Sequence, residues 1–259
     1  MTGHTPPLGI LSALPEEMGS LGAALDPESN VEVAGFHFRT GRIDGHSVVL
    51  AEAGVGKVAT ALVGGLLLDR FACRGLIFSG VAGRLDAELS IGDIVIAEEL
   101  IQHDYGAMVA GRLKSFRPGS APIGEARERP AFRLEPRLRQ AIAEAIADLR
   151  LPPFEVSGGS TRASRIRLGR VLSGDQFVNC TATRDRLARE FKGHAVEMEG
   201  AALAQVGERF GAPCVVVRCL SDLAGEESHI DFAAFLPAAA NVAAIVVRRL
   251  ISVMANTAR

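Results

Sequence analysis

The sequence has no tryptophan, a single tyrosine and only 5% aromatic residues in total. Proteins that bind single-stranded nucleic acids use aromatic side chains as stacking platforms, so this scarcity argues against such a role. Positive charge is lacking too, because 28 Lys and Arg residues are offset by 30 Asp and Glu and the formal net charge is −2. With this balance the protein has no net positive charge that would attract nucleic acid or an anionic membrane. We therefore expect neither nucleic acid nor membrane as a partner.

Cysteine is scarce as well, and the four thiols show no pairing pattern. Cys73, Cys180, Cys214 and Cys219 form no C-x-x-C motif, and three of them lie among apolar or small residues. Free thiols in a reducing compartment are the simplest interpretation. The N-terminus has no basic segment followed by an apolar one, and we find no apolar run long enough to span a bilayer. These features predict a soluble, cytoplasmic protein.

Apolar runs and amphipathic stretches alternate along the chain, and this alternation predicts one α/β domain over residues 1–259. The 48% hydrophobic content is enough for a sizeable core. We find neither a linker-like segment nor an internal repeat in the sequence. We expect a central, mostly parallel or mixed sheet with helices on both faces. Strands are predicted over 8–13, 36–42, 47–53, 76–79, 92–97, 171–177 and 215–220, and helices from residue 15 and over 58–71, 138–149, 183–191, 200–206 and 232–254.

Two stretches lack the periodicity of regular structure. Residues 110–130 hold Gly, Pro and Arg without a clear pattern and are predicted as a long loop. Residues 157–162 are predicted to be flexible, and the arginine-rich run that continues to Arg170 is interpreted as a solvated face.

A glycine-rich turn, GVGK at residues 54–57, follows one predicted strand and opens a helix. It fits the G-x-G-x-x-A dinucleotide fingerprint, but the acidic residue that should end the next strand is missing. It is not a P-loop, because Ala51 stands at the first glycine position and Val58 replaces the hydroxyl residue that binds Mg²⁺. Two interpretations stay open: a tight turn needed for packing, or a turn that lets a small ligand approach the backbone.

Patterns for metal binding or a serine nucleophile are weak. His103 and Asp104 have no second histidine nearby, and His229 lies far along the chain, so we expect structural roles and no metal site. The sequence contains no G-x-S-x-G elbow, and Ser173 in the Ser-Gly-Asp segment has no evident histidine partner. A serine hydrolase is therefore disfavoured.

Carboxylates stand at three predicted strand–helix junctions. Glu17 follows the first strand, Glu199 precedes a helix of small residues, and Asp222 ends an apolar strand. A carboxyl group at the end of a core strand is partly desolvated, which raises its pKa and suits a general acid. The simpler alternatives are a glutamate in a first helical turn and an aspartate that caps a turn. Arg218 lies in the same apolar strand as Asp222, and if buried it needs Glu199 or Glu17 as a partner.

Three carboxylates with no accompanying cofactor motif suit acid–base chemistry through a cation-like transition state, as in the hydrolysis of a glycosyl bond. One acid protonates the leaving group and one base activates water. The third carboxylate orients hydroxyl groups and balances charge.

Seven short segments carry the remaining signal: PEE at 15–17, GVGK at 54–57, GVAG at 80–83, GDIV at 92–95, SGDQF at 173–177, VEME at 196–199 and VRCLSD at 217–222. In this order and spacing, from about residue 8 to 253, the chain resembles the nucleoside phosphorylase superfamily. More narrowly, it resembles the 5′-methylthioadenosine/S-adenosylhomocysteine nucleosidases. The resemblance implies a three-layer α/β/α fold with a central mixed sheet, a homodimer, and no metal or organic cofactor.

The resemblance also implies roles for the three carboxylates. Glu17 would activate the attacking water, Glu199 would hold the ribose hydroxyls, and Asp222 would protonate purine N7 as the base leaves. Chemistry agrees with these roles, because purine departs poorly as an anion and protonation of N7 lowers the barrier. The ribosyl group gains positive charge, which nearby carboxylates stabilise.

Substrate-binding residues follow from the same resemblance. Phe177 would stack on adenine, the Val178 backbone would contact the adenine edge, and Met198 would pack against the sugar. The other positions that it marks are Ser221, which supports Asp222, Arg218, which pairs with the water and the carboxylates, and Val81 and Glu197.

Hydrolysis is favoured over phosphorolysis because the loop after the first strand carries Glu17, where the phosphorylases of the superfamily use an arginine to bind phosphate. A carboxylate there would repel phosphate and suits water activation. The substrate stays open, since Val81 replaces a hydroxyl residue of the best-known nucleosidases, residues 105–107 differ near the 5′ substituent, and segment 126–170 is longer and arginine-rich.

Alternatives within the same superfamily are therefore a purine nucleoside phosphorylase and a nucleosidase for futalosine, adenosylhopane or another 5′-modified nucleoside. A non-catalytic nucleoside-binding protein is less favoured, because a binder has little need for an acid at purine N7. A nicotinamide-dependent oxidoreductase rests only on the glycine-rich turn at 54–57 and lacks the acidic residue for the ribose.

Overall fold

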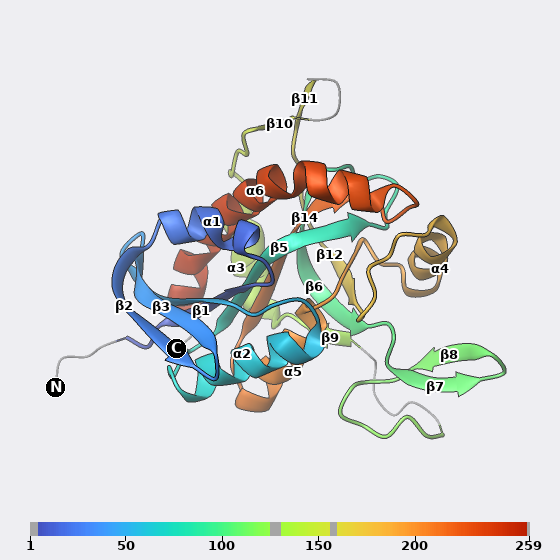
Figure 1. The fold of residues 1–259 in the computed structure, drawn as a ribbon, viewed down its shortest axis with the longest axis horizontal. Coiled ribbons are helices and arrows are strands. Elements are labelled where there is room, and N and C mark those ends of the chain that lie inside the picture. Colours follow the sequence, from blue (N-terminus) through green and yellow to red (C-terminus); the bar gives the residue numbers. More distant parts are fainter. Residues whose placement is uncertain (1–4, 125–130, 156–159, 258–259) are drawn as a thin grey trace.

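The computed structural model describes residues 5–124, 131–155 and 160–257, and a ten-stranded sheet runs through its centre (Figure 1). The strands of this sheet are β1 (Leu8–Ser12), β2 (Asp26–Val33), β3 (Phe36–Ile43), β4 (His46–Glu52), β5 (Leu76–Arg84), β6 (Ile94–Gln102), β9 (Ala131–Arg133), β12 (Ile166–Ser173), β13 (Ala195–Glu197) and β14 (Cys214–Asp222). Their order is β13-β12-β6-β14-β5-β1-β4-β3-β2, with β9 beside β6.

Strand directions divide the sheet into two groups. Each group is parallel within itself: β14, β5, β1 and β4 form one, and β6, β12 and β13 form the other. β2, β3 and β9 pair antiparallel with their neighbours. The two groups meet antiparallel, where β14 pairs with β6 and where the end of β5 pairs with β13. The sheet is therefore mixed, as expected.

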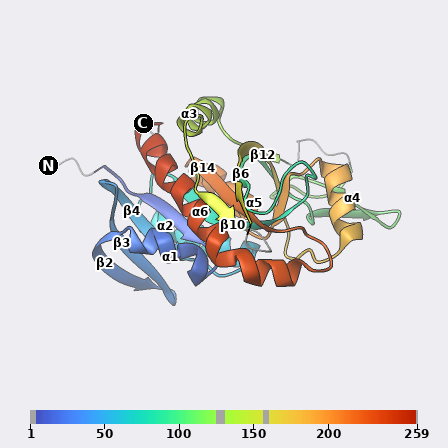
Figure 2. The same ribbon diagram turned by 90° about the horizontal axis from the view of Figure 1, so that it is seen from above.

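Helices cover both faces of this sheet (Figures 1 and 2). They are α1 (Pro15–Ala23), α2 (Lys57–Asp69), α3 (Pro136–Ile146), α4 (Thr181–Phe191), α5 (Gly200–Phe210) and α6 (Ser228–Thr257). α1 and α3 pack against α6, which contacts β14 and β5, and α2 packs against α5 on the other face. This is the predicted three-layer α/β/α arrangement.

Alternation along the central strands fills one apolar core on each face of the sheet. Ile77 of β5 packs in the core beneath α6, whereas its neighbour Phe78 packs in the core with Leu67 of α2 and Leu203 of α5. Successive residues of a strand point to opposite faces, so a strand buried on both sides reads as a continuous apolar run. This explains why the apolar run at 215–220 predicts β14 correctly.

The predicted strands and helices are all present, but some boundaries differ and several strands, among them β2 and β9, were not predicted. β5 continues to Arg84, so the GVAG segment at 80–83 lies inside the strand and not beyond its end. β6 likewise extends to Gln102. β2 was missed because seven of its eight residues are exposed, so no apolar alternation marks it.

Part of the predicted long loop has regular structure. β7 (Gly106–Val109) and β8 (Arg112–Ser115) form a hairpin at its start, so the loop prediction is wrong there. Residues 125–130 of that loop, and residues 157–159 of the stretch predicted to be flexible, lie outside the described residues. Thr161–Ala163 forms β11, which pairs with β10 (Pro153–Glu155).

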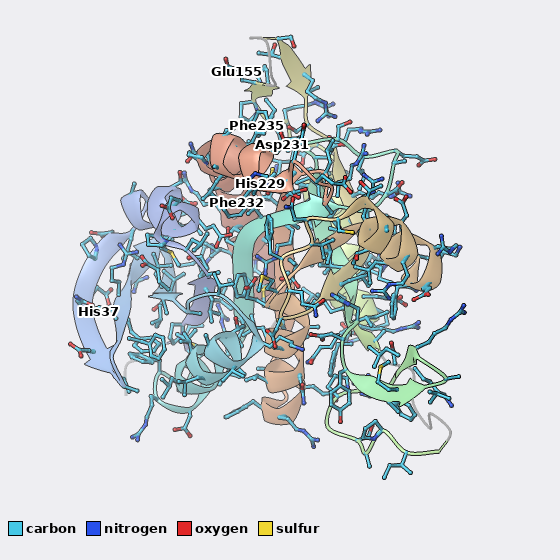
Figure 3. All side chains as sticks on the ribbon, turned by 45° about the vertical axis from the view of Figure 1, so that its right-hand side comes forward. His37, Glu155, His229, Asp231, Phe232 and Phe235 are labelled. Carbon is cyan, nitrogen blue, oxygen red and sulfur yellow. The ribbon has the colours of Figure 1, made fainter. Side chains whose placement is uncertain are left out.

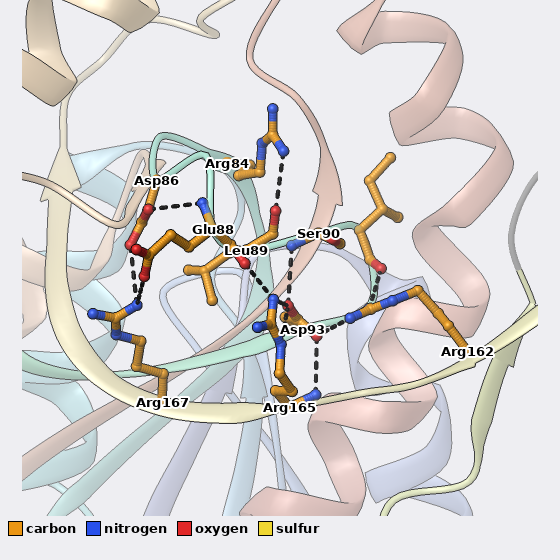
Figure 4. Close-up of polar contacts among 10 residues, drawn as sticks. Arg84, Asp86, Glu88, Leu89, Ser90, Asp93, Arg162, Arg165 and Arg167 are labelled. Atoms are coloured by element: carbon orange, nitrogen blue, oxygen red, sulfur yellow. Dashed lines mark hydrogen bonds and ion pairs between the residues drawn. The ribbon is translucent and has the colours of Figure 1, made fainter.

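The interpretation of the arginine-rich run as a solvated face is wrong for Arg162 and Arg170, whose side chains are 25% and 30% exposed, but it holds for Arg165 and Arg167, which are exposed. Figure 4 shows Arg162, Arg165 and Arg167 with their partners. Asp93, which is fully buried, accepts hydrogen bonds from the side chains of Arg162 and Arg165 and from the Arg165 and Ser90 backbones. Arg170 pairs with Glu99 in the same way. Charge patterning alone could not show this, because the carboxylate partners lie about 70 residues earlier in the sequence.

α6 contains a segment, Asp231–Asn256, that is long and apolar enough to cross a membrane by length and composition. The expectation that no apolar run reaches this length is therefore wrong. In the fold, 56% of that window is buried, and α6 lies across β14 and β5 with Ala239, Ala243 and Val246 in the core. A core helix of a globular fold meets the same criterion, and the packing of α6 is that of a core helix.

Candidate active site

Arg218 stands at the centre of a carboxylate cluster and is only 1% exposed. It lies in the middle of β14, and its guanidinium is 4.3 Å from the centroid of the Phe78 ring. Its Nη2 donates to Glu197 and, at 3.2 Å, to Glu199 Oε2. Burial opposes the charge on Arg218, but the surrounding glutamates raise its pKa and keep it protonated. The predicted pairing with Glu199 is confirmed, and Glu197 is a further partner.

The Glu17 carboxylate lies beside this arginine and joins the end of β1 to β5. Its Oε2 accepts hydrogen bonds from the backbone N–H groups of Ala13 (2.9 Å) and Leu14 (3.0 Å), and Oε1 accepts one from Val81 (3.0 Å). β1 pairs with β5 only as far as Phe78, so the Val81 N–H lies beyond the reach of β1. Burial raises the pKa of the Glu17 carboxyl, although the charge of Arg218 and the three backbone donors act against this.

Glu199 lies where β13 gives way to α5, as the N-cap residue of that helix. Its Oε1 accepts a hydrogen bond from the Gly56 N–H at 2.8 Å, and Oε2 faces Arg218. Burial raises the pKa of Glu199 to about 7, because Arg218 offsets only part of the cost of desolvation and Glu197 adds repulsion. Glu199 can therefore change its charge near neutral pH.

Glu197 anchors the cluster to the protein. It accepts hydrogen bonds from the N–H groups of Glu199 (3.1 Å) and Gly200 (2.8 and 3.0 Å) and from the Ser173 hydroxyl, besides its pairing with Arg218. The Ser173 hydroxyl oxygen in turn accepts from the Ala201 N–H at 2.8 Å. These bonds satisfy the first N–H groups of α5. Both oxygens are engaged within the protein, which favours positioning over substrate contact, and the substrate-binding role of Glu197 stays a prediction.

Two glycines of β5 leave room for the charged side chains of this site. A Cβ atom at Gly80 would lie 2.1 Å from Arg218 Nη1 and 2.8 Å from Glu17 Oε1. At Gly83 it would lie 2.9 Å from Asp222 Oδ1. The GVAG segment at 80–83 is thus a strand along which charged side chains approach the backbone closely.

Asp222 is the last residue of β14 and is 2% exposed. Its Oδ1 accepts a hydrogen bond from the Ala224 N–H at 2.9 Å, and Oδ2 lies 3.0 Å from the Ser221 hydroxyl. Burial raises the pKa of Asp222, although hydrogen bonds from Ala224, Ser221 and Ser228 oppose the shift. Both sequence interpretations hold, because Asp222 caps the turn that follows and is also a desolvated acid.

The residues expected to hold the substrate lie around these acids. Phe177 is 46% exposed, and its ring packs edge-to-face on Phe232 with the centroids 5.8 Å apart. Val178 is buried, and Met198 is half-buried between the two glutamates of the VEME segment. Figure 3 places Phe232 beside His229 and Asp231 at the start of α6. Contacts of these residues with a substrate stay predictions.

The glycine-rich turn at 54–57 serves this cluster. Gly54 and Gly56 have φ angles of 81° and 100°, which favour glycine, and the Gly56 N–H binds Glu199. Of the two open interpretations, a turn whose backbone approaches a functional group fits the structure better. Lys57, Asp104 and Asp175 form a polar cluster next to this turn, and the sequence motifs did not identify it as a unit.

Metal-ligating residues do not gather in the part of the chain that the structure describes, where no three His, Cys, Asp or Glu residues are placed to hold an ion. Figure 3 shows His229 at the start of α6 and His37 on β3, well apart from each other in that view. Asp104 accepts hydrogen bonds from Lys57 and from the Asp175 backbone, which is a structural role.

A cavity of about 590 Å³ lies elsewhere, between β9, the start of α3 and the end of α5. Phe132, Leu138 and Gly207 are among the residues that line it, and none of the acidic residues described above does. The candidate active site therefore rests on the chemistry of the carboxylate cluster and not on cavity size.

The mixed sheet, its helical layers and the buried acids along β5 define an α/β protein of the nucleoside phosphorylase type. The chain belongs to the phosphorylase superfamily, whose family model matches residues 7–252. It is 43% identical to the 5′-methylthioadenosine/S-adenosylhomocysteine nucleosidase of Mycobacterium tuberculosis, over 95% of this chain and 97% of that protein. It is 35% identical to the nucleosidase of Geobacillus thermodenitrificans, with 96% and 98% covered.

Solved structures give the same picture. The nucleosidase of Colwellia psychrerythraea in complex with adenine superposes with a TM-score of 0.81 and 31% identity, over 97% of this chain and 96% of that one. The futalosine hydrolase of Helicobacter pylori superposes with a TM-score of 0.78 and 30% identity, over 94% and 97%. This chain is thus similar to hydrolases that act on different nucleosides.

Proposed function

We propose that this protein hydrolyses the N-glycosidic bond of 5′-methylthioadenosine/S-adenosylhomocysteine-type nucleosides and releases adenine. The observation that carries the proposal is the placement of Glu17 and Asp222, two buried acids that approach the same short segment of β5. Burial raises the pKa of both carboxyl groups, a direction that favours proton transfer by carboxylic acids. The 43% identity to a nucleosidase of this specificity supports the choice of substrate.

In the proposed reaction, the Asp222 carboxyl gives its proton to purine N7 while the bond between the ribosyl carbon and the purine breaks. The Glu17 carboxylate takes a proton from water, and the water oxygen forms the new bond to that carbon. The products are adenine and a 5′-substituted ribose. Glu199 accepts hydrogen bonds from the ribose hydroxyls, and the negative charge of the cluster stabilises the cation-like transition state.

Hydrolysis fits Glu17 better than phosphorolysis does. The backbone N–H groups of Ala13, Leu14 and Val81 hold this carboxylate beside Gly80, in the first turn of α1, and a phosphate bound there would need positive charge. Arg218 is the nearby cation, and its Nη2 is engaged by Glu197 and Glu199. A phosphate ion would meet net negative charge here.

A futalosine-type nucleoside is the second candidate substrate, and the likeness to the Helicobacter pylori futalosine hydrolase favours it. Both substrate classes require the same acid and base, so the carboxylate cluster does not separate them. The difference lies in the group at the 5′ carbon.

The deciding assay incubates the protein with methylthioadenosine in phosphate-free buffer and measures free adenine. Adenine release that does not depend on phosphate supports the proposal. Release only after phosphate is added would make the protein a phosphorylase. Futalosine and S-adenosylhomocysteine, tested in parallel at equal concentration, rank the 5′ groups by kcat/KM.

We further propose that the protein is a cytoplasmic homodimer. Exposed apolar side chains near the active site, Val55, Val58 and Leu62, support the dimer, since such patches mark protein–protein interfaces. The four cysteines are unpaired, which suits a reducing compartment.

A further inference from the structure

A second polar cluster lies beside the carboxylates, and the proposed chemistry does not use it. Lys57 is the first residue of α2, Asp104 lies two residues after β6, and Asp175 lies two residues after β12. Lys57 Nζ is 2.6 Å from Asp104 Oδ1 and 3.5 Å from Asp175 Oδ2. The Lys57 N–H donates to Asp175 Oδ1, and the Asp175 N–H donates to Asp104 Oδ2, both at 2.9 Å. We call this cluster the three-loop clasp.

The clasp is closed, because each of its three residues binds the other two. It joins loops that are 47 to 118 residues apart in the sequence. The Lys57 and Asp104 side chains are 16% and 21% exposed, so their ion pair is less screened by solvent than a surface pair. The hydrogen bonds from Lys57 and Asp175 lower the pKa of Asp104 despite the opposing effect of burial, so Asp104 stays ionised.

Two of the joined loops carry residues of the candidate active site. Gly56, next to Lys57, donates its N–H to Glu199. Phe177, expected to stack on adenine, lies two residues after Asp175 in the other loop. The loops touch closely, since a Cβ atom at Gly56 would lie 3.3 Å from Asp175 Oδ1.

We propose that Lys57, Asp104 and Asp175 are positioning residues that hold the Phe177 loop against the Gly56 turn and so fix the place of the purine relative to the ribose. This inference rests on the proposed nucleosidase function. Breaking the clasp leaves Glu17, Glu199 and Asp222 in place. It lets Phe177, on which the purine would stack, shift away from them. Binding of adenine and of substrate then weakens, because the loop must be ordered at the cost of binding energy.

A purely structural role is the competing explanation, because Asp175 Oδ1 also accepts the Lys57 N–H at the start of α2 and so caps that helix. Lys57→Met separates the two roles. The substitution keeps the Lys57 N–H that Asp175 caps and the Asp175 N–H bond to Asp104, and it removes the ammonium group that binds both carboxylates. A cap alone therefore survives this change, whereas the clasp loses both of its ion pairs.

The test compares wild type, Lys57→Met, Asp104→Asn and the double variant by three measurements: KM for methylthioadenosine, the Kd of adenine by calorimetry, and the melting temperature. We expect Lys57→Met to raise KM and the adenine Kd about tenfold, within the range of coupling between contacting residues. The adenine Kd of the double variant should exceed that of the more weakly binding single variant by no more than about twofold, because both substitutions disrupt the same cluster.

Arg248→Met is the matched control, since it removes a basic residue that pairs with Asp44 on the surface. Its adenine Kd should equal that of wild type. The proposal is overturned if Lys57→Met and Asp104→Asn lower the melting temperature but leave the adenine Kd unchanged, or if their effects on Kd simply add. If Lys57→Met does not fold, Asp104→Asn alone decides by its Kd.

Failure of the proposed function is visible separately, as a wild-type protein that releases no adenine from any nucleoside. Failure of the clasp is visible as a wild-type protein that releases adenine alongside variants with an unchanged Kd. The two results cannot be confused, because one concerns wild type and the other the difference between wild type and variants.

Discussion

At the scale of single residues, the site is governed by one arginine facing more negative charge than it can neutralise. Arg218 contacts Glu197 and Glu199, and Glu17 lies close enough to influence its pKa. With all three glutamates ionised, the buried cluster carries excess negative charge, which is costly in a desolvated place. Protonation of Glu199, with its pKa of about 7, relieves that cost near neutrality.

Glu199→Gln is therefore predicted to stabilise the folded protein at alkaline pH. The folded-state pKa of about 7 exceeds the ordinary value of 4.5, so the folded protein binds this proton more tightly than the unfolded chain. Wild-type stability should then fall as pH rises from about 4.5 to 7, and the glutamine variant should lack this loss. At pH 8 we expect its free energy of unfolding to be higher by roughly 2 to 3 kcal/mol.

Urea unfolding of wild type and Glu199→Gln at pH 5 and pH 8 measures this difference. Glu88→Gln, which changes an exposed glutamate, serves as the control and should behave as wild type at both pH values. Adenine release by Glu199→Gln should drop by roughly a hundredfold, because the ribose loses a charged partner. Equal unfolding free energies of wild type and Glu199→Gln at pH 8 would contradict the prediction.

Asp222→Asn is predicted to lower kcat by about a thousandfold while KM changes little, because the amide cannot supply the proton to purine N7. Asparagine still accepts the Ala224 N–H and fits beside Ser221, so the fold should be kept. Steady-state kinetics of adenine release measure the effect. Asp231→Asn, which changes a nearby acid at the start of α6, is the control and should keep most activity (Figure 3). Loss of kcat in Asp231→Asn equal to that in Asp222→Asn would point to a general charge effect.

At the scale of elements, the sequence predicts what depends on local pattern. The apolar run before Asp222 and the small-residue helix after Glu199 both predict their elements, and their junctions place the acids correctly. What depends on partners distant in sequence was not predictable. Glu197 shows its role only when Ser173 and Arg218 approach from other strands, and the clasp appears only when β6 and β12 lie side by side.

The link between the arginine-rich segment and the sheet gives a prediction for an element. Arg162 of β11 donates to the buried Asp93 and to the Ile91 carbonyl, which fastens the β10–β11 hairpin to the start of β6 (Figure 4). Arg162→Met is expected to lower the free energy of unfolding by roughly 1 to 3 kcal/mol, because Asp93 stays buried with one charged partner fewer. Arg165 still binds Asp93 and limits the loss.

Urea unfolding measures this effect, and Arg167→Met is the control. Arg167 belongs to the same arginine run but pairs with the exposed Glu88 and the partly exposed Asp86, so its loss should cost less than about 1 kcal/mol. If Arg162→Met and Arg167→Met lowered the free energy of unfolding equally, the burial of Asp93 would not explain the stabilisation by Arg162. Adenine release at 25 °C should be retained in both variants.

At the scale of the whole molecule, the exposed apolar surface of α2 favours association with a second copy of the chain. Val58 and Leu62 are 81% and 48% exposed and lie one helical turn apart, and Val55 precedes them in the glycine-rich turn. This patch, Val55, Val58 and Leu62, adjoins Gly56, whose N–H holds Glu199. A second copy of the chain seated there would bury the patch and steady the turn that serves the active site.

Val58→Glu is therefore predicted to convert the proposed dimer to a monomer, because a charge in the middle of an apolar interface must be desolvated without a partner. Sedimentation should give wild type about twice the chain mass of 27.3 kDa, and the variant a mass near that of one chain. Val31→Glu, on the edge strand β2, adds the same charge at another exposed valine and should stay dimeric. A wild-type protein that sediments as one chain would refute the dimer. A monomeric Val58→Glu variant should also show a higher KM, because the Gly56 turn loses its support while Asp222 and Glu17 keep their own backbone contacts.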